Sequence, residues 1–353
     1  MTSVSAKKTK LQVIPRRGFT FTELLVVMVL LVLLASLFLP ALQAARENAR
    51  AQQCKSRVQK LASGAIQVLE AHGGFPSSGW GNGWMPDATL GIGPKQPGAW
   101  GYQVLPYIGQ EELYSLGSKA TTLAEKCKAN VQRATTPLAI WNCPSRRPAK
   151  LYPVPTKVNW GPVQKPHLCN RLTESIRNDY SMNAGDSLAY DGLASVGYNG
   201  SDPQEKTNEY MQKVARLPYK ALTGITWRGS KVRAHDISDG MSNTYLIGEK
   251  AISIDFMGRA DKQEWGDDQN PYTADERDSV RWADPDICPR PILDTTGIKG
   301  EEFSWVFGSP HPEGFTMSFC DGSVRTISYK IDLQTHADLA NRHDGHKTDP
   351  STL

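Results

Sequence analysis

The sequence lacks the short motifs that mark several large classes of enzyme and metal-binding protein. It contains no Gly-x-Ser-x-Gly of a serine hydrolase, no P-loop and no His-Glu-x-x-His of a zinc protease. None of its six cysteines belongs to a Cys-x-x-Cys pair, which argues against a zinc ribbon. The net charge of +4 over 353 residues is too small for a dedicated nucleic-acid-binding protein. We therefore predict no enzyme activity, no cofactor, no metal ligand and no nucleic-acid partner.

Long apolar runs are also scarce, and the single one lies near the N-terminus. From Leu24 to Leu39 every residue is apolar except Ser36. As a helix, residues 19–39 would be about 32 Å long, enough to cross a hydrocarbon core of about 30 Å. Residues 1–18 carry five Lys or Arg and no acid, so we expect them to stay in the cytoplasm. This predicts a single-pass protein of the cytoplasmic membrane with an extracytoplasmic head.

Two features at this run need an explanation beyond a simple anchor. A cleaved secretory signal would need a small-residue cleavage site after the run, and residues 42–45 are a poor match to one. Glu23 places a carboxylate at the start of the run, where a charge is costly and usually functional. A position at headgroup level, before the span begins, is the alternative for Glu23.

Residues 17–25, Arg-Gly-Phe-Thr-Phe-Thr-Glu-Leu-Leu, resemble the type IV prepilin (class III) signal. In that family a prepilin peptidase cuts after the glycine and methylates the new N-terminal phenylalanine. The resemblance implies that Gly18 and Phe19 flank the cut and that Glu23 is the assembly residue. It also places Pro40 where many pilins have a proline. The implied partners are the peptidase/methyltransferase, other pilin-like subunits and an assembly platform.

The chemistry of Glu23 agrees with assembly. Cutting would create an ammonium group at Phe19, which can pair with Glu23 of a neighbouring subunit in an apolar environment. Such head-to-tail contacts propagate as a helical filament, of the type II secretion or type IV pilus kind. A membrane-tethered module that binds polysaccharide or protein without polymerising is the alternative, favoured by nine tryptophans. An esterase using the Gly-Asp-Ser-Leu at residues 185–188 is a third hypothesis.

The composition predicts four segments. They are a cytoplasmic leader (1–18), a transmembrane and assembly helix (19–40), an amphipathic helical spine (41–72) and a head (73–353). The spine is rich in helix formers, and one face of it carries apolar residues spaced by three or four. These are Cys54, Val58, Leu61, Ala65 and Leu69. Gly73 and Gly74 should end the helix.

The head has few regular signals until its C-terminal part. Strands are predicted at residues 243–248, 303–307 and 315–319, the last followed by an Asp321-Gly322 hairpin turn and a second β-rich run. Short helices are predicted within 100–116 and at 331–341, where Asp332 is the expected cap. Residues 184–215 look like a long loop. We predict a pilin-like α+β fold in which a long N-terminal helix packs on a loop-rich head with an antiparallel sheet.

The C-terminal part resembles the DUF1559 family of prepilin-like proteins, abundant in planctomycetes. His311 precedes Asp321-Gly322 by the spacing of that family's H-X9-DG motif. Cys320 departs from the family, which usually has alanine there. Further segments that match its pattern are 54–55, 105–108, 143–145, 236–240, 242–244 and 308–312.

Three groups of residues each have two interpretations from the sequence alone. Because Cys54 and Cys143 both lie in family-matching segments, we predict a disulfide between them, with free thiols as the alternative. His311 and Asp321 are expected to be structural, bracing the loop against the hairpin; an acid–base pair is the other interpretation. Seven acids within 261–278 could hold Ca²⁺, but a solvated acidic loop is the preferred interpretation.

Overall fold

The computed structural model describes residues 18, 20–81, 83–155, 157–158, 161–162, 168–187, 222–259, 261, 266–274, 276–287, 290–296 and 304–346. Phe19 and nearly all of the predicted leader lie outside this set, as does most of the predicted 184–215 loop. The chain divides into two compact units, Met1–Asn48 and Ala49–Leu353. We describe each unit by itself.

Helix α1 (Phe21–His72) contains both the apolar run and the predicted spine. It is the one helix among the described residues that is long and apolar enough to cross a membrane. Pro40 lies inside it without ending it, although a proline removes one helical hydrogen bond. The helix ends where Gly73 adopts a left-handed φ of 70° and donates to the Leu69 carbonyl at 2.8 Å. The predicted stop is confirmed.

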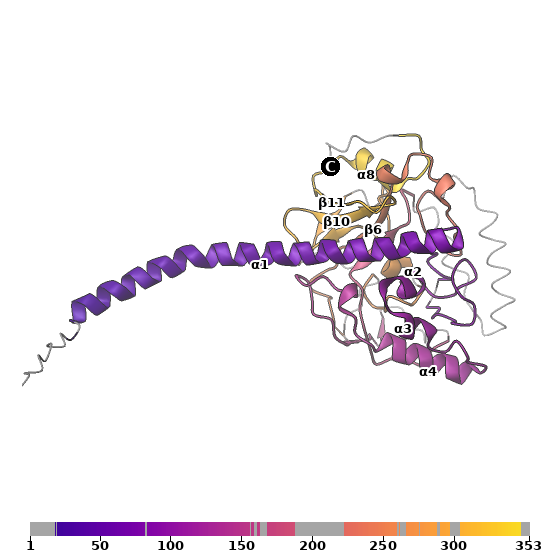
Figure 1. Ribbon diagram of the computed structural model, residues 1–353, viewed down its shortest axis with the longest axis horizontal. Coiled ribbons are helices and arrows are strands. Elements are labelled where there is room, and N and C mark those ends of the chain that lie inside the picture. Colours follow the sequence, from indigo (N-terminus) through magenta and orange to yellow (C-terminus); the bar gives the residue numbers. More distant parts are fainter. Residues whose placement is uncertain are drawn as a thin grey trace, which may run out of the picture. The chain divides into compact units, whose positions relative to one another are not determined.

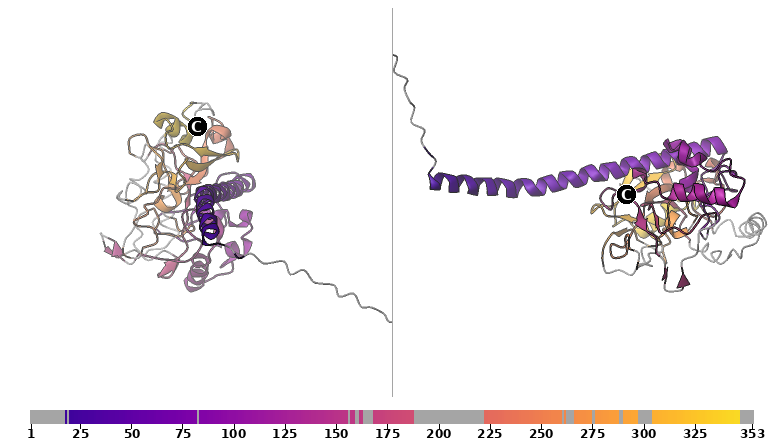
Figure 2. Two further views of the ribbon diagram at one scale, coloured as in Figure 1. Left: turned by 90° about the vertical axis from the view of Figure 1, so that its left-hand side faces the viewer. Right: turned by 90° about the horizontal axis from the view of Figure 1, so that it is seen from below.

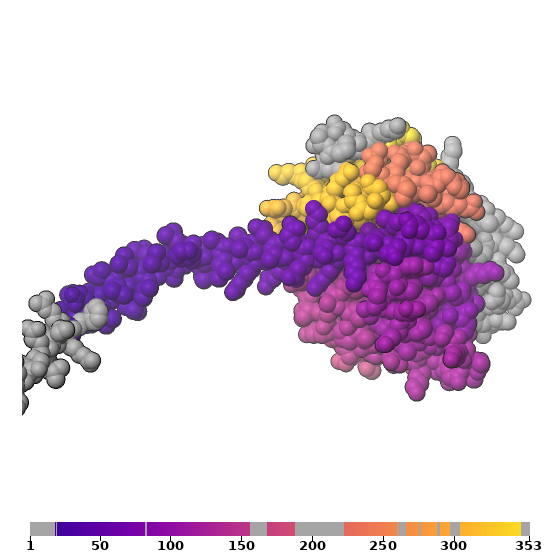
Figure 3. Space-filling model, in the orientation of Figure 1, coloured from indigo at the N-terminus to yellow at the C-terminus, as the bar shows by residue number. Residues whose placement is uncertain are grey.

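Within the second unit, α1 buries one face against the head. All five residues of the predicted apolar face are buried, together with Ala62, Gly64 and Val68. Gly64 is needed for the close approach of a neighbouring segment, because a Cβ there would lie 2.9 Å from Cγ2 of Ile108. Figure 3 shows this part of α1 set into the surface of the head, between the yellow C-terminal segments and the magenta ones.

Short helices follow α1 in the chain. The predicted helix within 100–116 is broken into three pieces, α2 (Trp100–Gln103), η1 (Leu105–Ile108) and α3 (Glu111–Ser115). Pro106 begins a new turn, and Gly109, with a φ of 77°, ends it. Helix α4 (Leu123–Ala134) was not predicted. Its N-terminus has a capping box, in which Thr122 and Glu125 each accept a backbone N–H of the other. The short η2 (Ala139–Trp141) leads into the turn that carries Cys143.

A five-stranded sheet forms the centre of the head, in the order β11-β10-β6-β5-β7. Its strands are β5 (Tyr180–Asn183), β6 (Tyr245–Glu249), β7 (Val280–Arg281), β10 (Phe315–Phe319) and β11 (Val324–Ile327). All neighbours are antiparallel except β5 and β7, which are parallel. The described strands and helices confirm the α+β prediction, and Figures 1 and 2 show α1 alongside this sheet within the second unit.

The remaining elements are small. Two-residue pairs are formed by β1 (Tyr152–Pro153) with β4 (Glu174–Ser175), β2 (Lys157–Val158) with β3 (Gly161–Pro162), and β8 (Ile292–Leu293) with β9 (Gly308–Ser309). Turns of helix occur at η5 (Ala234–Asp236), η6 (Met241–Asn243) and α6 (Glu276–Ser279). The strand predicted at 303–307 is reduced in the described residues to single bridges at Val306 and Phe307.

The predicted C-terminal hairpin and helix are confirmed. Strands β10 and β11 pair in register from Phe315 opposite Ile327 to Ser318 opposite Val324. In the turn, Asp321 accepts hydrogen bonds from the backbone and hydroxyl of Ser323, and Gly322 has a φ of 86°. Helix α8 (Leu333–Ala340) is capped by Asp332, whose side chain accepts the Thr335 N–H at 2.9 Å.

Candidate functional site

The start of α1 carries the residues implied in processing and assembly. Thr20 and Glu23 form a capping box: Oε2 of Glu23 accepts the Thr20 N–H at 2.8 Å, and Oγ1 of Thr20 accepts the Glu23 N–H at 3.3 Å. Glu23 is the only ionisable residue between Phe19 and Ala45. Its carboxylate therefore has a partner within its own helix, a role that the sequence analysis did not foresee.

The residues that follow Glu23 present apolar side chains all around the helix. Every large apolar side chain from Leu24 to Leu34, and again from Leu37 to Leu39, is exposed within the first unit. A helix that is apolar on all faces is stable only where lipid or other protein surrounds it. This segment is therefore suited to a bilayer or to a bundle of like helices.

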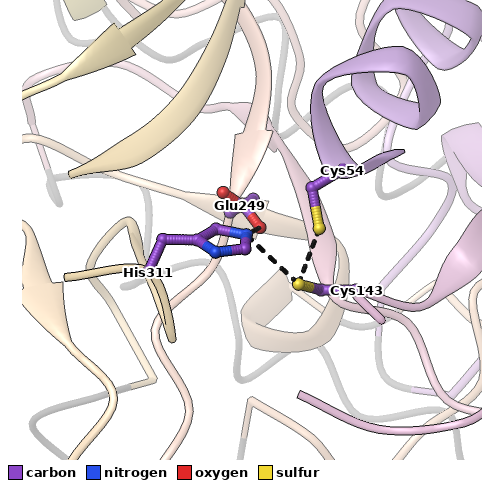
Figure 4. A group of neighbouring side chains, drawn as sticks. All are labelled: Cys54, Cys143, Glu249 and His311. Atoms are coloured by element: carbon purple, nitrogen blue, oxygen red, sulfur yellow. Dashed lines mark hydrogen bonds and ion pairs between the residues drawn. The ribbon is translucent and has the colours of Figure 1, made fainter. Parts of the chain in front are cut away.

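A second group of functional side chains meets inside the head. Cys54, Cys143, Glu249 and His311 each offer one ligand atom, and these atoms all lie within 4.8 Å of one another. The Sγ atoms of Cys54 and Cys143 are 2.6 Å apart. Nε2 of His311 lies 3.4 Å from Cys143 Sγ and 3.5 Å from Glu249 Oε1. Figure 4 shows the four side chains pointing toward one another.

Four separate segments bring these side chains together. Cys54 lies on the buried face of α1, Cys143 follows η2, Glu249 ends strand β6, and His311 lies in the loop between β9 and β10. All four are buried. His311, the histidine of the H-X9-DG motif, thus lies beside the part of α1 that follows the apolar run.

Electrostatics couple the imidazole to its neighbours. Burial would lower the pKa of His311, but its contacts with Cys143 and Glu249 outweigh burial and raise that pKa. Burial would raise the pKa of Glu249, yet His311 holds it below its usual value. Burial raises the pKa of the Cys143 thiol. The carboxylate and the imidazolium therefore stabilise each other's charge beside two thiols.

The chain matches two family models. One, described as a prokaryotic N-terminal methylation motif, matches residues 15–39. The other, described as a protein of unknown function (DUF1559), matches residues 43–334, which is most of the chain. The chain belongs to the DUF1559 family. The methylation motif and the apolar helix also make this DUF1559 protein a prepilin-like, membrane-anchored subunit, as predicted. No curated protein and no solved structure matches it.

The turn of the DUF1559 chain that holds Cys143 is fixed by buried ion pairs. Arg146 binds Asp294 at 2.7 Å, and Arg147 binds Asp267 at 2.6 Å. Asp179 lies between the two arginines and accepts the Cys143 N–H at 2.7 Å. These contacts hold the Cys143 backbone toward α1.

The same ion pairs correct the prediction of a solvated acidic loop. Of the seven acids within 261–278, Asp267, Asp268 and Asp278 are buried, Asp261 is exposed, and Glu264 and Asp275 lie outside the described residues. Asp267 and Asp278 lie 4.0 and 3.8 Å from the Lys250 ammonium, whose pKa burial lowers to about 8. Cationic side chains therefore already neutralise Asp267 and Asp278.

The other predicted residues have separate partners. Asp321 is exposed and accepts hydrogen bonds in its own turn, whereas His311 belongs to the buried cluster. In the Gly-Asp-Ser-Leu stretch, Asp186 donates its N–H to Thr223 and accepts a hydrogen bond from Asn341. The predicted Cys54–Cys143 disulfide has its two sulfurs adjacent and stays a prediction.

Glu249 is the cluster residue that the sequence analysis missed. It follows the apolar stretch of the predicted strand 243–248, so a strand one residue longer would have placed a carboxylate in the core. A charged residue at the end of a buried strand indicates that an oppositely charged or hydrogen-bonding side chain lies beside it.

Proposed function

We propose that this DUF1559 protein is a structural subunit of a type II secretion or type IV pilus-like filament rather than an enzyme. It would be cut after Gly18, methylated on Phe19 and held in the cytoplasmic membrane, with its head on the extracytoplasmic side. Its partners would be the prepilin peptidase/methyltransferase, further pilin-like subunits and an assembly platform. The observation that carries the proposal is the methylation motif at the start of α1, which among the described helices is the one suited to a membrane.

Assembly would depend on an exchange of partners at Glu23. In the single chain its carboxylate caps its own helix through Thr20. In a filament the same carboxylate would accept the methylated ammonium of a neighbour's Phe19. Because an ammonium and a carboxylate attract each other strongly in an apolar environment, the exchange would favour staggered subunits.

The binding-module alternative receives less support than its tryptophan count suggested. Of the seven tryptophans in the described part of the chain, Trp227 and Trp305 are half-buried, each beneath an arginine guanidinium. The other five are buried, namely Trp80, Trp84, Trp100, Trp141 and Trp282. Buried rings stabilise a core and offer no surface on which a sugar or peptide could stack.

Mass spectrometry and cross-linking in native membranes test the proposal. We expect wild type, Glu23→Ala and Thr20→Ala to carry a methylated Phe19, while only Glu23→Ala loses the ladder of cross-linked oligomers. Thr20→Ala is the matched control, since it removes a capping side chain but keeps the carboxylate.

Each part of the proposal can fail separately. An intact Met1, or a cut near Ala45, would contradict processing. An unchanged ladder in Glu23→Ala would contradict the ion pair. Equal losses in Glu23→Ala and Thr20→Ala would assign the effect to the helix cap instead.

A further inference from the structure

We propose that Cys54, Cys143, Glu249 and His311 form a structural Zn²⁺ site that joins α1 to the head. Two thiolates, one imidazole nitrogen and one carboxylate oxygen are a ligand set that zinc accepts in four-coordinate sites. Here all four ligand atoms lie within 4.8 Å of one another, on side chains that are buried. A site with four protein ligands is closed, so its role is structural rather than catalytic.

His311 contacts the other ligands in a way that suits a shared cation. The same atom, Nε2, faces both Cys143 Sγ at 3.4 Å and Glu249 Oε1 at 3.5 Å (Figure 4). A metal cation between Nε2, Cys143 Sγ and Glu249 Oε1 would bind all three atoms at once. A proton, in contrast, can be shared by only one or two of them.

Glu249 distinguishes a metal site from a simple disulfide. A disulfide between Cys54 and Cys143 requires neither a carboxylate nor an imidazole beside it. Oε2 of Glu249 accepts the Thr316 N–H at 2.9 Å, but Oε1 is buried and accepts no hydrogen bond from the described residues. Among the described residues it makes an ion pair with Nε2 of His311 at 3.5 Å. A buried carboxylate oxygen with so few partners is costly, and a bound cation would satisfy it.

Hydrogen bonds around the cluster orient its members. The backbone N–H of Cys143 donates to Asp179, the backbone N–H of His311 donates to Ser309 Oγ at 3.1 Å, and the backbone N–H of Thr316 donates to Glu249. Contacts of this type commonly position metal ligands from outside the coordination sphere. They leave both sulfurs, Nε2 and Oε1 directed inward.

Binding requires one small adjustment. The sulfurs lie 2.6 Å apart. Two thiolates bound to a tetrahedral ion at about 2.3 Å each would be about 3.8 Å apart, so the sulfurs must separate by about 1 Å. Rotation of the two side chains provides this, and both thiols lose their protons on binding.

Metal analysis of the full chain tests the site directly. The protein is purified from membranes in detergent with its thiols kept reduced, its zinc is counted by mass spectrometry, and the zinc is then exchanged for Co²⁺. We expect about one zinc per chain, and for cobalt a thiolate charge-transfer band with the strong visible bands of a tetrahedral ion. Chelation should lower the melting temperature of the wild-type head by several degrees.

Matched variants assign the ligands. We expect Cys143→Ser and Glu249→Gln to lower metal affinity at least tenfold and to change the cobalt spectrum, whereas Glu249→Asp keeps an oxygen ligand and retains metal. Cys320→Ala is the control, because this buried cysteine lies outside the cluster with its sulfur 3.7 Å from the Tyr245 carbonyl oxygen. If a variant fails to fold, the zinc content and the cobalt spectrum of the wild-type protein still decide whether the site binds metal.

Three results would overturn the proposal. They are wild-type protein with free thiols and no bound metal, a Cys54–Cys143 disulfide in protein alkylated at lysis, and an unchanged cobalt spectrum in Glu249→Gln. None of them bears on processing or filament assembly, which are tested at the other end of α1.

Discussion

His336 should make the stability of the head depend on pH. Its ring lies in the core, on helix α8, with only 1% of the residue exposed. The aromatic rings of Tyr245, Phe307 and Phe315 surround it with centroids 5.5, 6.3 and 6.0 Å away, and its Nδ1 lies 3.3 Å from the Tyr245 hydroxyl. Burial among these rings lowers the pKa of His336 from 6.5 to about 3.

The sign and size of the effect follow from this pKa. Below pH 6.5 the unfolded chain takes up a proton at His336, while the folded chain does not until about pH 3. The contribution of His336 to stability is therefore complete above pH 6.5 and is lost as the pH falls, by about 1.4 kcal/mol per pH unit. Between pH 8 and pH 5 the loss from this residue is about 2 kcal/mol.

Urea unfolding of the detergent-solubilised chain, followed by tryptophan fluorescence, measures the effect. We expect His336→Gln, which cannot titrate, to lose about 2 kcal/mol less than wild type between pH 8 and pH 5. His235→Gln is the matched control, because that histidine is exposed. Parallel losses in wild type and His336→Gln would refute the reasoning.

Two further substitutions test the packing of α1 and the buried ion pairs. Gly64→Val should lower the free energy of unfolding by about 1–3 kcal/mol, because the added side chain overpacks against Ile108. Adding Ile108→Ala should partly restore stability. Ser63→Val is the control at an exposed position and should change the melting temperature little. Arg147→Met should lower the free energy of unfolding in urea by about 3–5 kcal/mol, because it leaves Asp267 buried without its closest cation. The double variant Arg147→Met with Asp267→Asn should lose less stability than Arg147→Met alone. A full loss in the double variant would contradict the ion-pair explanation.

Local patterns account for much of the fold. The apolar run, the spacing of Val58, Leu61 and Ala65, and the Gly73 stop are properties of neighbouring residues, and α1 follows them. The Asp321-Gly322 turn likewise brings β10 and β11 together. Helix α4 has an equally local signal, the Thr122-x-x-Glu125 capping box, which the sequence analysis overlooked.

Local sequence patterns could not predict which strands, far apart in the chain, become neighbours in the sheet. The order β11-β10-β6-β5-β7 places segments far apart in the chain side by side, and no periodicity encodes which strands become neighbours. The acidic loop shows the same limit. Its carboxylates looked solvated until the fold placed Arg147 and Lys250 against them.

The sequence by itself determined the class of this protein. A methylation motif, one apolar helix and an H-X9-DG motif are contiguous or regularly spaced, so each can be recognised without a fold. Only the tertiary structure decided that Cys54, Cys143, Glu249 and His311 share one buried site. The physical reason is that burial and electrostatic contact depend on distance in space, and these four residues come from four segments that meet only when α1 packs on the head.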